Sequence, residues 1–509
     1  MTFRFVPTPL DTPLVLPEPR DGGLQTALRE AFVPSAARET ALARLSEPGA
    51  LAVTSGQQPG LFTGPLYTVH KALSTAALAR VLERQWSRPV VPIFWIAGDD
   101  HDFAEASHTA WLGADGSLLT GSLPPRPTDA PLTPMYHQPL GDGVVAALEA
   151  LGASLPASEF RDETLAWLGR HYRPEAMVAA AFAGAMAELV APSGIVCFDS
   201  THPAAKAAAA PIIIRALEHA GAIDADLERQ SEALGETART SGVTVGDGAA
   251  LVMLEGKQGR DRLVVSEGGF VTRRGRERFS LDDLAAIAER EPRRLSPNVL
   301  LRPVVEGALL PTVSYLGGPA ELRYLAFTPP VYRRLGVERQ RPLPRWSGVL
   351  VEPRVDRVLE KFGIDLAELL EPSGSLEARL VRSRLPGEAL EALASIRAAL
   401  EQGYSRLEQT ASDIDPTLVR PIQGARHQAL AGTQDIEKKL VQHLKRRQET
   451  ELGQIGRART AVLPGGKPQE RVLTVAPFLA RYGPALVDDL RDAIEGWYAG
   501  ALEGASTPS

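Results

Sequence analysis

Three segments of this sequence repeat one plan, in which an apolar strand ends at a turn and a helix-forming stretch follows. The strands are ALAVT at 50–54, PVVPIFWIA at 89–97 and the apolar centre of SGIVCFDS at 193–200. Strands that are apolar on both faces are typical of a parallel sheet covered by helices above and below. The repetition therefore predicts an α/β fold with an open parallel sheet and right-handed crossovers.

Two regions depart from this plan. Residues 249–275 contain two or three short strands joined by glycine-containing turns, which predicts an antiparallel hairpin insert at about 243–279. The stretch that follows is rich in Ala, Glu, Leu, Arg and Gln and predicts two long helices broken near SDIDPT, which pack as an antiparallel α-helical coiled-coil arm. The predicted division is a core at 1–373, the arm at 374–462 and a return to the core at 463–509.

Net charge and cysteine content argue against several classes of protein. The 509 residues carry a formal net charge of −7, which does not favour a general nucleic-acid binder. The single cysteine, Cys197, excludes a disulfide framework within the chain and fits a buried strand position and a cytoplasmic location. The N-terminus lacks the pattern of a signal peptide, and no apolar run is long enough to predict a membrane span.

The stretch SGQQPGLFTGPLYTVHKALS, which follows the first strand, predicts part of a binding site. Ligands of open α/β sheets bind beyond the carboxyl ends of the strands, where this glycine-rich loop would lie. A helix that begins at Pro65 would point its free N–H groups at a carboxylate or phosphate. Tyr67 and Lys71 would share one face of that helix, with His70 beside them.

The second strand leads into GDDHDFAEASH at 98–108, the most acidic candidate segment. Crowded carboxylates raise one another's pKa and a neighbouring imidazolium lowers it, so such a cluster can hold a general base for a substrate ammonium. The alternative is a capped helix start with solvated acids. No spacing in the segment is diagnostic of a metal site, and we predict none.

A third candidate stretch runs from SPNVLLRPVVEG to LGGPAELRY, at 296–324. Asn298, Arg302 and Glu306 lie one helical turn apart and would line one helix face. The Gly317-Gly318 turn leads to a helix that contains Glu321. The sequence contains no phosphate-binding loop, no dinucleotide-binding glycine motif and no nucleophile elbow.

Four strings of the sequence, three of them within the stretches above, together resemble the BshC family, the cysteine-adding ligases of bacillithiol biosynthesis. They are SGQQPGLFTGPLYTVHK, PIFWIAGDDHDFAEASH, SPNVLLRPVVEGALLPTVSYLGGPAELRY and QERVLTVAPFLARYG, and their order spans about 50 to 490. The resemblance implies a Rossmann-like core with connecting inserts, and a coiled-coil arm that forms a homodimer. It also implies that L-cysteine is joined to the amino group of glucosaminyl-malate.

The resemblance and the residue patterns give one set of candidate site residues. The predicted catalytic residues are Asp100, His101, His70 and Lys71. The predicted substrate-binding residues are Gln57, Gln58, Gly64, Tyr67, Asp99, Asp102, Asn298, Arg302, Glu306, Gly317, Gly318 and Glu321. Either Asp100 or His101 would be the base for the amine, while Lys71, His70 and the helix N-terminus would hold a carboxylate or phosphate.

Several alternatives remain open at this level. Carboxyl activation normally uses ATP, but the sequence shows no phosphate loop, so the cofactor is left unassigned. PLYTVHK is faintly similar to the histidine motif of class I synthetases and nucleotidyltransferases, which makes an adenylate-forming enzyme the second hypothesis. A third is a non-catalytic ligand-binding scaffold. We predict no nucleic-acid or membrane partner.

Overall fold

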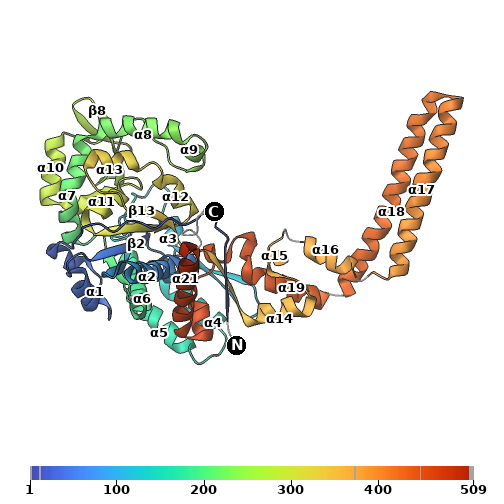
Figure 1. The fold of residues 1–509 in the computed structure, drawn as a ribbon, viewed down its shortest axis with the longest axis horizontal. Coiled ribbons are helices and arrows are strands. Elements are labelled where there is room, and N and C mark those ends of the chain that lie inside the picture. The colour runs from blue at the N-terminus through green and yellow to red at the C-terminus, as the bar shows by residue number, and fades with distance from the viewer. Residues whose placement is uncertain (1–2, 11–12, 372–373, 384, 448, 504–509) are drawn as a thin grey trace. The chain divides into compact units, whose positions relative to one another are not determined.

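The computed structural model describes residues 3–10, 13–371, 374–383, 385–447 and 449–503 (Figure 1). These residues form two compact units. The larger consists of Phe5–Leu350 and Gln469–Ser509, and the smaller of Met1–Arg4 and Val351–Pro468. The division therefore falls before the predicted boundary at 373 and after the predicted one at 462, and the helices at 353–369 belong with the arm.

The larger unit is built on a five-stranded sheet in the order β13-β12-β2-β3-β6, in which all four pairings are parallel. The strands are β2 (Leu51–Gln57), β3 (Val90–Ile96), β6 (Val196–Asp199), β12 (Thr312–Gly317) and β13 (Arg341–Pro344). This confirms the predicted open parallel sheet. The chain moves outward from β2 to β3 and β6, and outward on the other side from β12 to β13. Parallel sheets bind ligands where the strand order reverses in this way, here between β2 and β12.

Both faces of the sheet are buried, which explains its unbroken apolar strands. Alternate residues of a strand point to opposite faces. Val91, Ile93 and Trp95 of β3 pack into one core with Ala205 and Ile213 of α7 (Pro203–Glu218). On the other face lies α2 (Leu66–Trp86), which contacts β2 and β3 and is itself covered by α21 (Ala485–Glu503).

A second five-stranded sheet has the order β10-β9-β8-β7-β11, and every pairing is antiparallel. Its strands are β7 (Ala249–Gly256), β8 (Gly259–Ser266), β9 (Gly269–Thr272), β10 (Arg278–Phe279) and β11 (Leu295–Pro297). The predicted hairpin insert is confirmed, and β11 extends it beyond the predicted end. The remaining strands are β1 (Arg4–Pro7), β4 (His108–Leu112), β5 (Leu118–Ser122) and β14 (Gly348–Val351).

Local sequence signals explain where several helices begin. Pro65 is the N-cap of α2, and proline at the first turn removes an N–H that would have no helical partner. Ser280 caps α10 in a reciprocal capping box with Asp283. The other helices of this unit are α1 (Arg38–Leu45), α3 (Phe103–Ala106), α4 (Gly143–Ser154), α5 (Arg161–His171), α6 (Val178–Val190), α8 (Ala220–Leu234), α9 (Glu236–Thr240), α10 (Leu281–Arg290), α11 (Arg302–Leu309), α12 (Pro319–Leu325), α13 (Pro329–Leu335) and α20 (Ala476–Tyr482).

The smaller unit is helical and contains a long helical hairpin, which Figure 1 shows as α17 and α18. Its helices are α14 (Pro353–Phe362), α15 (Leu366–Leu369), α16 (Ser375–Arg382), α17 (Gly387–Ile414), α18 (Val419–Arg447) and α19 (Glu449–Val462). The break near SDIDPT is confirmed, because α17 ends at Ile414 and Pro416 begins a short turn. The two long helices predicted are α17 and α18, and the shorter helices α16 and α19 flank them, with Pro386 between α16 and α17.

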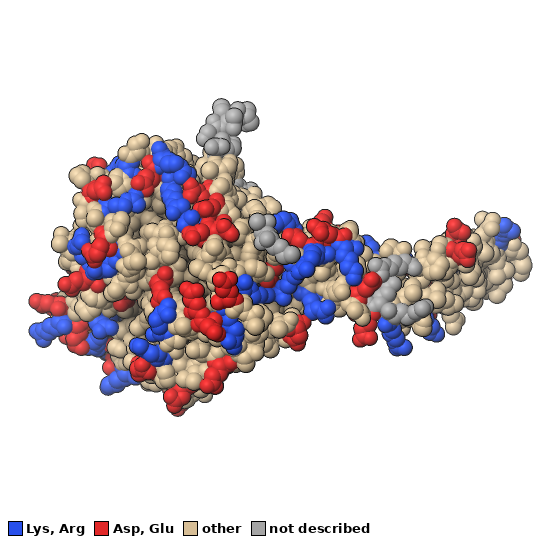
Figure 2. Space-filling model, turned by 90° about the horizontal axis from the view of Figure 1, so that it is seen from below, with Lys and Arg blue, Asp and Glu red and all other residues tan. Residues whose placement is uncertain are grey.

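The surface carries both signs of charge. Figure 2 shows acidic and basic side chains interspersed over one face of the larger unit. No helix among the described residues combines the length and apolarity that a membrane span requires.

Candidate active site

A cleft of about 540 Å³ lies in the larger unit, at the carboxyl ends of β2, β3 and β12. Polar and charged side chains from six separate parts of the chain line it: Gln57, Gln58, Tyr67, Lys71, Asp99, Asp100, His101, Glu105, Arg260, Arg262, Asn298, Arg302, Tyr315, Glu321, Tyr324, Arg345 and Arg471. The cleft therefore occupies the reversal point of the sheet. It brings Lys71 and Asp100 into one site.

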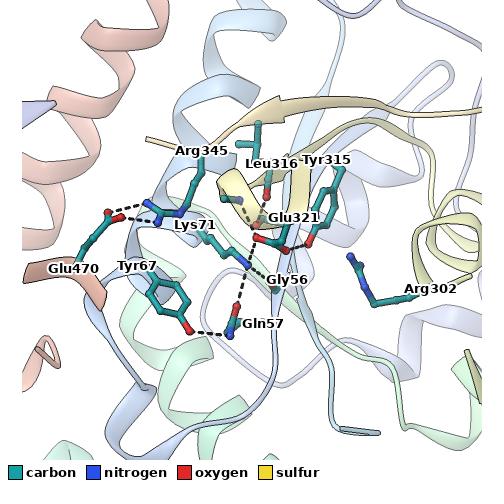
Figure 3. A network of polar contacts seen from close by, with 12 residues as sticks. Gly56, Gln57, Tyr67, Lys71, Arg302, Tyr315, Leu316, Glu321, Arg345 and Glu470 are labelled. Carbon is teal, nitrogen blue, oxygen red and sulfur yellow. Dashed lines mark hydrogen bonds and ion pairs between the residues drawn. The ribbon is translucent and has the colours of Figure 1, made fainter. Parts of the chain in front are cut away.

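Lys71, on α2, connects this helix to the end of β2 at one side of the cleft. Figure 3 shows its side chain pointing between Gln57 and Glu321. Its ammonium donates to the Gly56 carbonyl at 2.9 Å and to Gln57 Oε1 at 2.9 Å, and lies 2.6 Å from Glu321 Oε2. These partners use all three N–H groups of the ammonium. Burial lowers the pKa of Lys71, and Glu321 opposes that shift.

Glu321 joins the end of β12 to this side of the cleft. Besides Lys71, it accepts hydrogen bonds from the Gly318 N–H at 2.8 Å and from the Tyr315 hydroxyl at 2.8 Å. Burial raises the pKa of Glu321, but Lys71 and the Gly318 N–H outweigh burial and leave the pKa below its ordinary value. Glu321 is therefore ionised at neutral pH and forms a buried ion pair with Lys71.

The glycine-rich loop has a strained backbone, and hydrogen bonds from residues distant in sequence stabilise it. Phe62 and Thr63 both adopt left-handed backbone conformations, at φ 49° and 67°, which are unfavourable for a bulky and a β-branched residue. The Tyr172 hydroxyl accepts from the Thr63 N–H at 2.7 Å and donates to the Gly60 carbonyl at 3.0 Å. The Thr474 hydroxyl donates to the Phe62 carbonyl at 2.8 Å. These contacts fix the loop that follows Gln57.

The acidic segment after β3 divides into cleft residues and structural residues. Asp99 pairs with Lys206 at 2.6 Å, and Asp100 accepts from the Asp102 N–H at 2.9 Å through Oδ1, which leaves Oδ2 available. Asp102 caps α3 by accepting from the Glu105 N–H. Burial and the neighbouring Arg260 guanidinium lower the pKa of His101, so His101 is neutral near pH 7.

Arg260 also determines how His101 can act. Its Nη1 lies 3.3 Å from His101 Nδ1, and because a guanidinium only donates, Nδ1 is the acceptor. The proton of the neutral imidazole is then on Nε2. In this arrangement His101 offers a hydrogen-bond donor, whereas Asp100 offers a carboxylate oxygen that can accept a proton.

Of the three residues predicted to lie one helical turn apart, two line the cleft and the third, Glu306, lies beneath them. Asn298 lines the cleft and caps the following turn through bonds from the Leu300 and Leu301 N–H groups. Arg302 lies over the Tyr315 ring at 4.8 Å and donates to Glu306 Oε2 at 2.9 Å. Glu306 is fully buried and accepts from Gln340 as well, so it positions Arg302 from below.

An Arg345–Glu470 pair, which the sequence did not predict, closes the cleft beside α2. Two nitrogens of Arg345 contact the two oxygens of Glu470 at 2.8 and 2.7 Å. Glu470 also contacts His70 Nδ1 at 3.0 Å and accepts from the Ser347 hydroxyl at 2.7 Å. Burial opposes ionisation of Glu470, but His70 and Arg345 hold its pKa far below the ordinary value.

Three further arginines line the cleft without a carboxylate partner among the described residues: Arg260, Arg262 and Arg471. Arg260 is buried and bonds only neutral groups, namely Ser296 Oγ at 2.9 Å, the Pro297 carbonyl at 2.8 Å and His101. Arg260 and Arg262 are two residues apart on β8 and so point to the same side of the strand. The i, i+2 spacing of Arg260 and Arg262 in a predicted strand is the one sequence signal that could have identified these two residues.

Five of the predicted site residues lie outside the cleft lining: Gly64, His70, Asp102, Glu306 and Gly317. His70 is fully buried, bonds Glu470 and packs edge-on against Trp346. Gly64 turns the chain into α2 at φ 70°, and Gly317 accepts from the Arg345 N–H. The N-terminus of α2 is not free either, since its first N–H, at Leu66, donates to the Leu473 carbonyl at 2.7 Å.

The side chains present favour acid–base and anion-binding chemistry. Among the described residues, no group of three or more His, Cys, Asp or Glu side chains is placed to hold a metal ion. The cleft instead combines an available carboxylate, an imidazole N–H donor and several guanidinium groups. Such a set can bind carboxylates and accept a proton from an amine.

The chain matches two family models over most of its length. Residues 24–346 match "Bacillithiol biosynthesis BshC, N-terminal Rossmann-like domain", and residues 348–497 match "Bacillithiol biosynthesis BshC, C-terminal coiled-coil domain". The fold described above agrees with both descriptions.

Curated relatives give the same result. A protein of Salinibacter ruber named "Putative cysteine ligase BshC" is 32% identical over 88% of this chain and 82% of its own length. A protein with the same name from Koribacter versatilis is 33% identical over 87% of this chain and 82% of its own length. Another, from Bacillus licheniformis, is 24% identical over 90% of this chain and 85% of its own length.

Proposed function

This chain belongs to the BshC family of bacillithiol biosynthesis, and we propose that it is a ligase that joins the carboxyl group of L-cysteine to the amino group of glucosaminyl-malate. The relatives' name supports cysteine as one substrate. Glucosaminyl-malate is our proposal for the other, and its chemistry fits the charges of the cleft.

The observation that carries this proposal is the set of cleft arginines without carboxylate partners. Arg260, Arg262 and Arg471 bring three guanidinium groups to the lining, and no described carboxylate lies within ion-pair distance of them. The malyl group of the proposed acceptor carries two carboxylates. Guanidinium groups bind carboxylates through paired N–H···O bonds, so a dianionic amino sugar supplies the missing negative charge.

Asp100 is our proposed general base. An amine attacks only when it is neutral, so a group must take its proton close to the reacting atoms. Asp100 lines the cleft and has one carboxylate oxygen available, whereas His101 Nδ1 is occupied by Arg260. His101 would instead donate its Nε2–H to an oxygen of the substrates.

The proposed bond changes are those of amide formation. The amino nitrogen of the sugar attacks the cysteine carboxyl carbon, the C–N bond forms and one C–O bond breaks. The substrate ammonium loses two protons, which Asp100 accepts and passes on to the departing oxygen, and that oxygen leaves as water. If the carboxyl group carries an activating phosphate, the oxygen leaves with that phosphate and Asp100 releases the protons to solvent. Because negative charge develops on the remaining carboxyl oxygen, nearby N–H donors stabilise the transition state.

Direct detection of the product tests this function. Purified protein should convert L-cysteine and glucosaminyl-malate to bacillithiol, measured by accurate mass after labelling of the thiol. Reactions with and without ATP also show whether a nucleotide is cleaved in step with amide formation. A strain that lacks the gene should lose bacillithiol and accumulate glucosaminyl-malate. An unchanged thiol profile in that strain would contradict the proposal, and adenylation of a different acid would favour the second hypothesis.

We also propose that the helical hairpin α17–α18 forms a homodimer. It exposes apolar side chains, among them Ile414 at 74% and Ile436 at 53%. A second copy could cover them. Light scattering of a variant without residues 385–460 should report a monomer, and a dimer that persists would count against this role. The cytoplasmic location stays a prediction.

A further inference from the structure

We infer that Gly318, Glu321 and Arg345 form the subsite that binds the α-carboxylate and α-ammonium groups of an amino acid. The inference rests on the proposed function and extends it, because it assigns the cysteine to one defined part of the cleft. All three residues line the cleft.

The first observation is an unused edge on the Arg345 guanidinium. A guanidinium carries five N–H donors. Three are engaged, because Nη1 donates to the Trp346 carbonyl at 2.6 Å and to Glu470, and Nη2 donates to Glu470. The Nε–H is buried and has no partner among the described residues. A buried donor without a partner is costly, and native proteins retain such groups mainly where a ligand or water completes them.

The second observation is the space left open by Gly318. A methyl group at this position would lie 3.7 Å from Arg345 Nε, 4.0 Å from its Nη2 and 3.5 Å from Glu321 Oε2. The unused guanidinium edge and the carboxylate therefore border the same small space. The backbone of Gly318, at φ −76°, is one that any residue adopts, so conformation does not require a glycine there.

The third observation is the local charge. Arg345 is balanced by Glu470, and Glu321 is balanced by Lys71. An amino acid is a zwitterion and brings no net charge to this balanced region. Its carboxylate would accept from Arg345 Nε. Its ammonium would donate to Glu321 Oε1, which accepts only from the Tyr315 hydroxyl and so retains one acceptor position, whereas Oε2 is occupied by Lys71 and the Gly318 N–H.

Glu470 acts as the positioning residue of this subsite. It binds the end of the guanidinium that faces away from Gly318, and Figure 3 shows Arg345 extended toward it. The guanidinium is 4% exposed as part of Arg345 and cannot rotate without breaking both contacts. The Nε–H is thus held ready for the substrate, and little ordering is needed when the substrate binds.

The test is Gly318→Ala, which fills the space without a backbone or steric cost to the fold. We expect the KM for L-cysteine to rise about 10- to 100-fold, which corresponds to the loss of a charge-assisted hydrogen bond. The KM for glucosaminyl-malate should stay within about twofold of the wild type, since that substrate binds elsewhere. Arg345→Lys should have a similar effect, because lysine can still pair with Glu470 but lacks the Nε edge.

Arg459→Lys is the matched control for Arg345→Lys. Arg459 is also buried and paired with a carboxylate, Glu377, but lies in the smaller unit. Both lysine variants should lose comparable thermal stability, and only Arg345→Lys should change the KM for cysteine. If Arg345→Lys does not fold, Gly318→Ala alone decides the question.

Calorimetric titration of L-cysteine into the full-length protein separates this inference from the proposed function. Wild-type protein should bind L-cysteine and Gly318→Ala should bind it about 10- to 100-fold more weakly, whether or not an amide is formed. Folded Gly318→Ala protein with wild-type affinity for L-cysteine would overturn the inference. Absence of amide formation by wild-type protein that still binds cysteine in this way would overturn the proposed function alone.

Discussion

The two sides of the cleft differ in whether their charged side chains have partners of opposite charge within the protein. Beside α2, two cations have buried carboxylate partners: Lys71 with Glu321, and Arg345 with Glu470. On the side formed by β8, Arg260 and Arg262 have no carboxylate partner among the described residues. We call these the paired side and the unpaired side.

Because of this difference, we expect substitutions on the paired side to affect mainly the stability of the fold and substitutions on the unpaired side to affect mainly binding or catalysis. Removing one member of a buried ion pair leaves an uncompensated charge, so changes on the paired side should unfold the protein more readily. On the unpaired side no partner is left behind, and changes there should reduce binding or catalysis while the fold persists. The difference also matches the two proposed substrates, a zwitterion and a dianion.

The largest expected effect is on catalysis at Asp100, whose neighbour His101 contacts Arg260 of the unpaired side. Asp100→Asn keeps the shape of the side chain but cannot accept the amine proton. We expect amide formation to fall about 100- to 10,000-fold, with an unchanged melting temperature. His101→Gln keeps an N–H donor near the position of Nε2 and should retain much more activity, measured as product formed per unit time.

Equal losses of activity in these two variants would contradict the assignment of Asp100 as the base. Full activity in Asp100→Asn would contradict any catalytic role for this carboxylate.

The next largest effect is on stability at the paired side. Glu470→Gln leaves Arg345 as a buried cation, and we expect a loss of about 3 kcal/mol in the free energy of unfolding. The folded pKa of Glu470 lies below its unfolded value, which is about 4.3 for a free glutamate. Its stabilisation is therefore complete above that pH and is lost as the pH falls toward the folded pKa.

Urea unfolding at several pH values measures this effect. The difference in stability between wild type and Glu470→Gln should shrink as the pH falls below about 4.3. Glu39→Gln is the control, because Glu39 forms an exposed pair with Arg38 and should change stability by less than about 0.5 kcal/mol. A pH-independent difference for Glu470→Gln would contradict the account of this pair.

The smallest effect is on affinity at the unpaired side. Arg262→Ala removes one guanidinium that has no protein carboxylate to leave unpaired. The KM for glucosaminyl-malate should rise about tenfold, and this effect should weaken as salt screens the interaction. Arg290→Ala removes an exposed arginine outside the cleft lining and should leave both KM values unchanged.

Much of the fold was predictable because its signals are local. The apolar run 90–96 is buried on both faces of a sheet, and Ser280 and Pro319 mark helix starts that need no tertiary information. The hairpin insert was predictable for the same reason. Its last strand, β11, was missed because three residues show no periodicity.

The site was only partly predictable because its contacts are distant in sequence. Glu470 meets Arg345 across 125 residues that include the helical arm, so no spacing rule could join them. His70 and Lys71 are neighbours on α2, and successive helix residues point in directions about 100° apart. Only one of the two could face the cleft. No local pattern distinguishes Lys71 from His70 as the residue that faces the cleft.

The most direct test is a crossed measurement of both KM values in Gly318→Ala and Arg262→Ala. Two substrates held by separate sides of one cleft predict that Gly318→Ala raises only the KM for L-cysteine and that Arg262→Ala raises only the KM for glucosaminyl-malate. If each variant raised both KM values by the same factor, the division of the cleft into two substrate sites would be wrong.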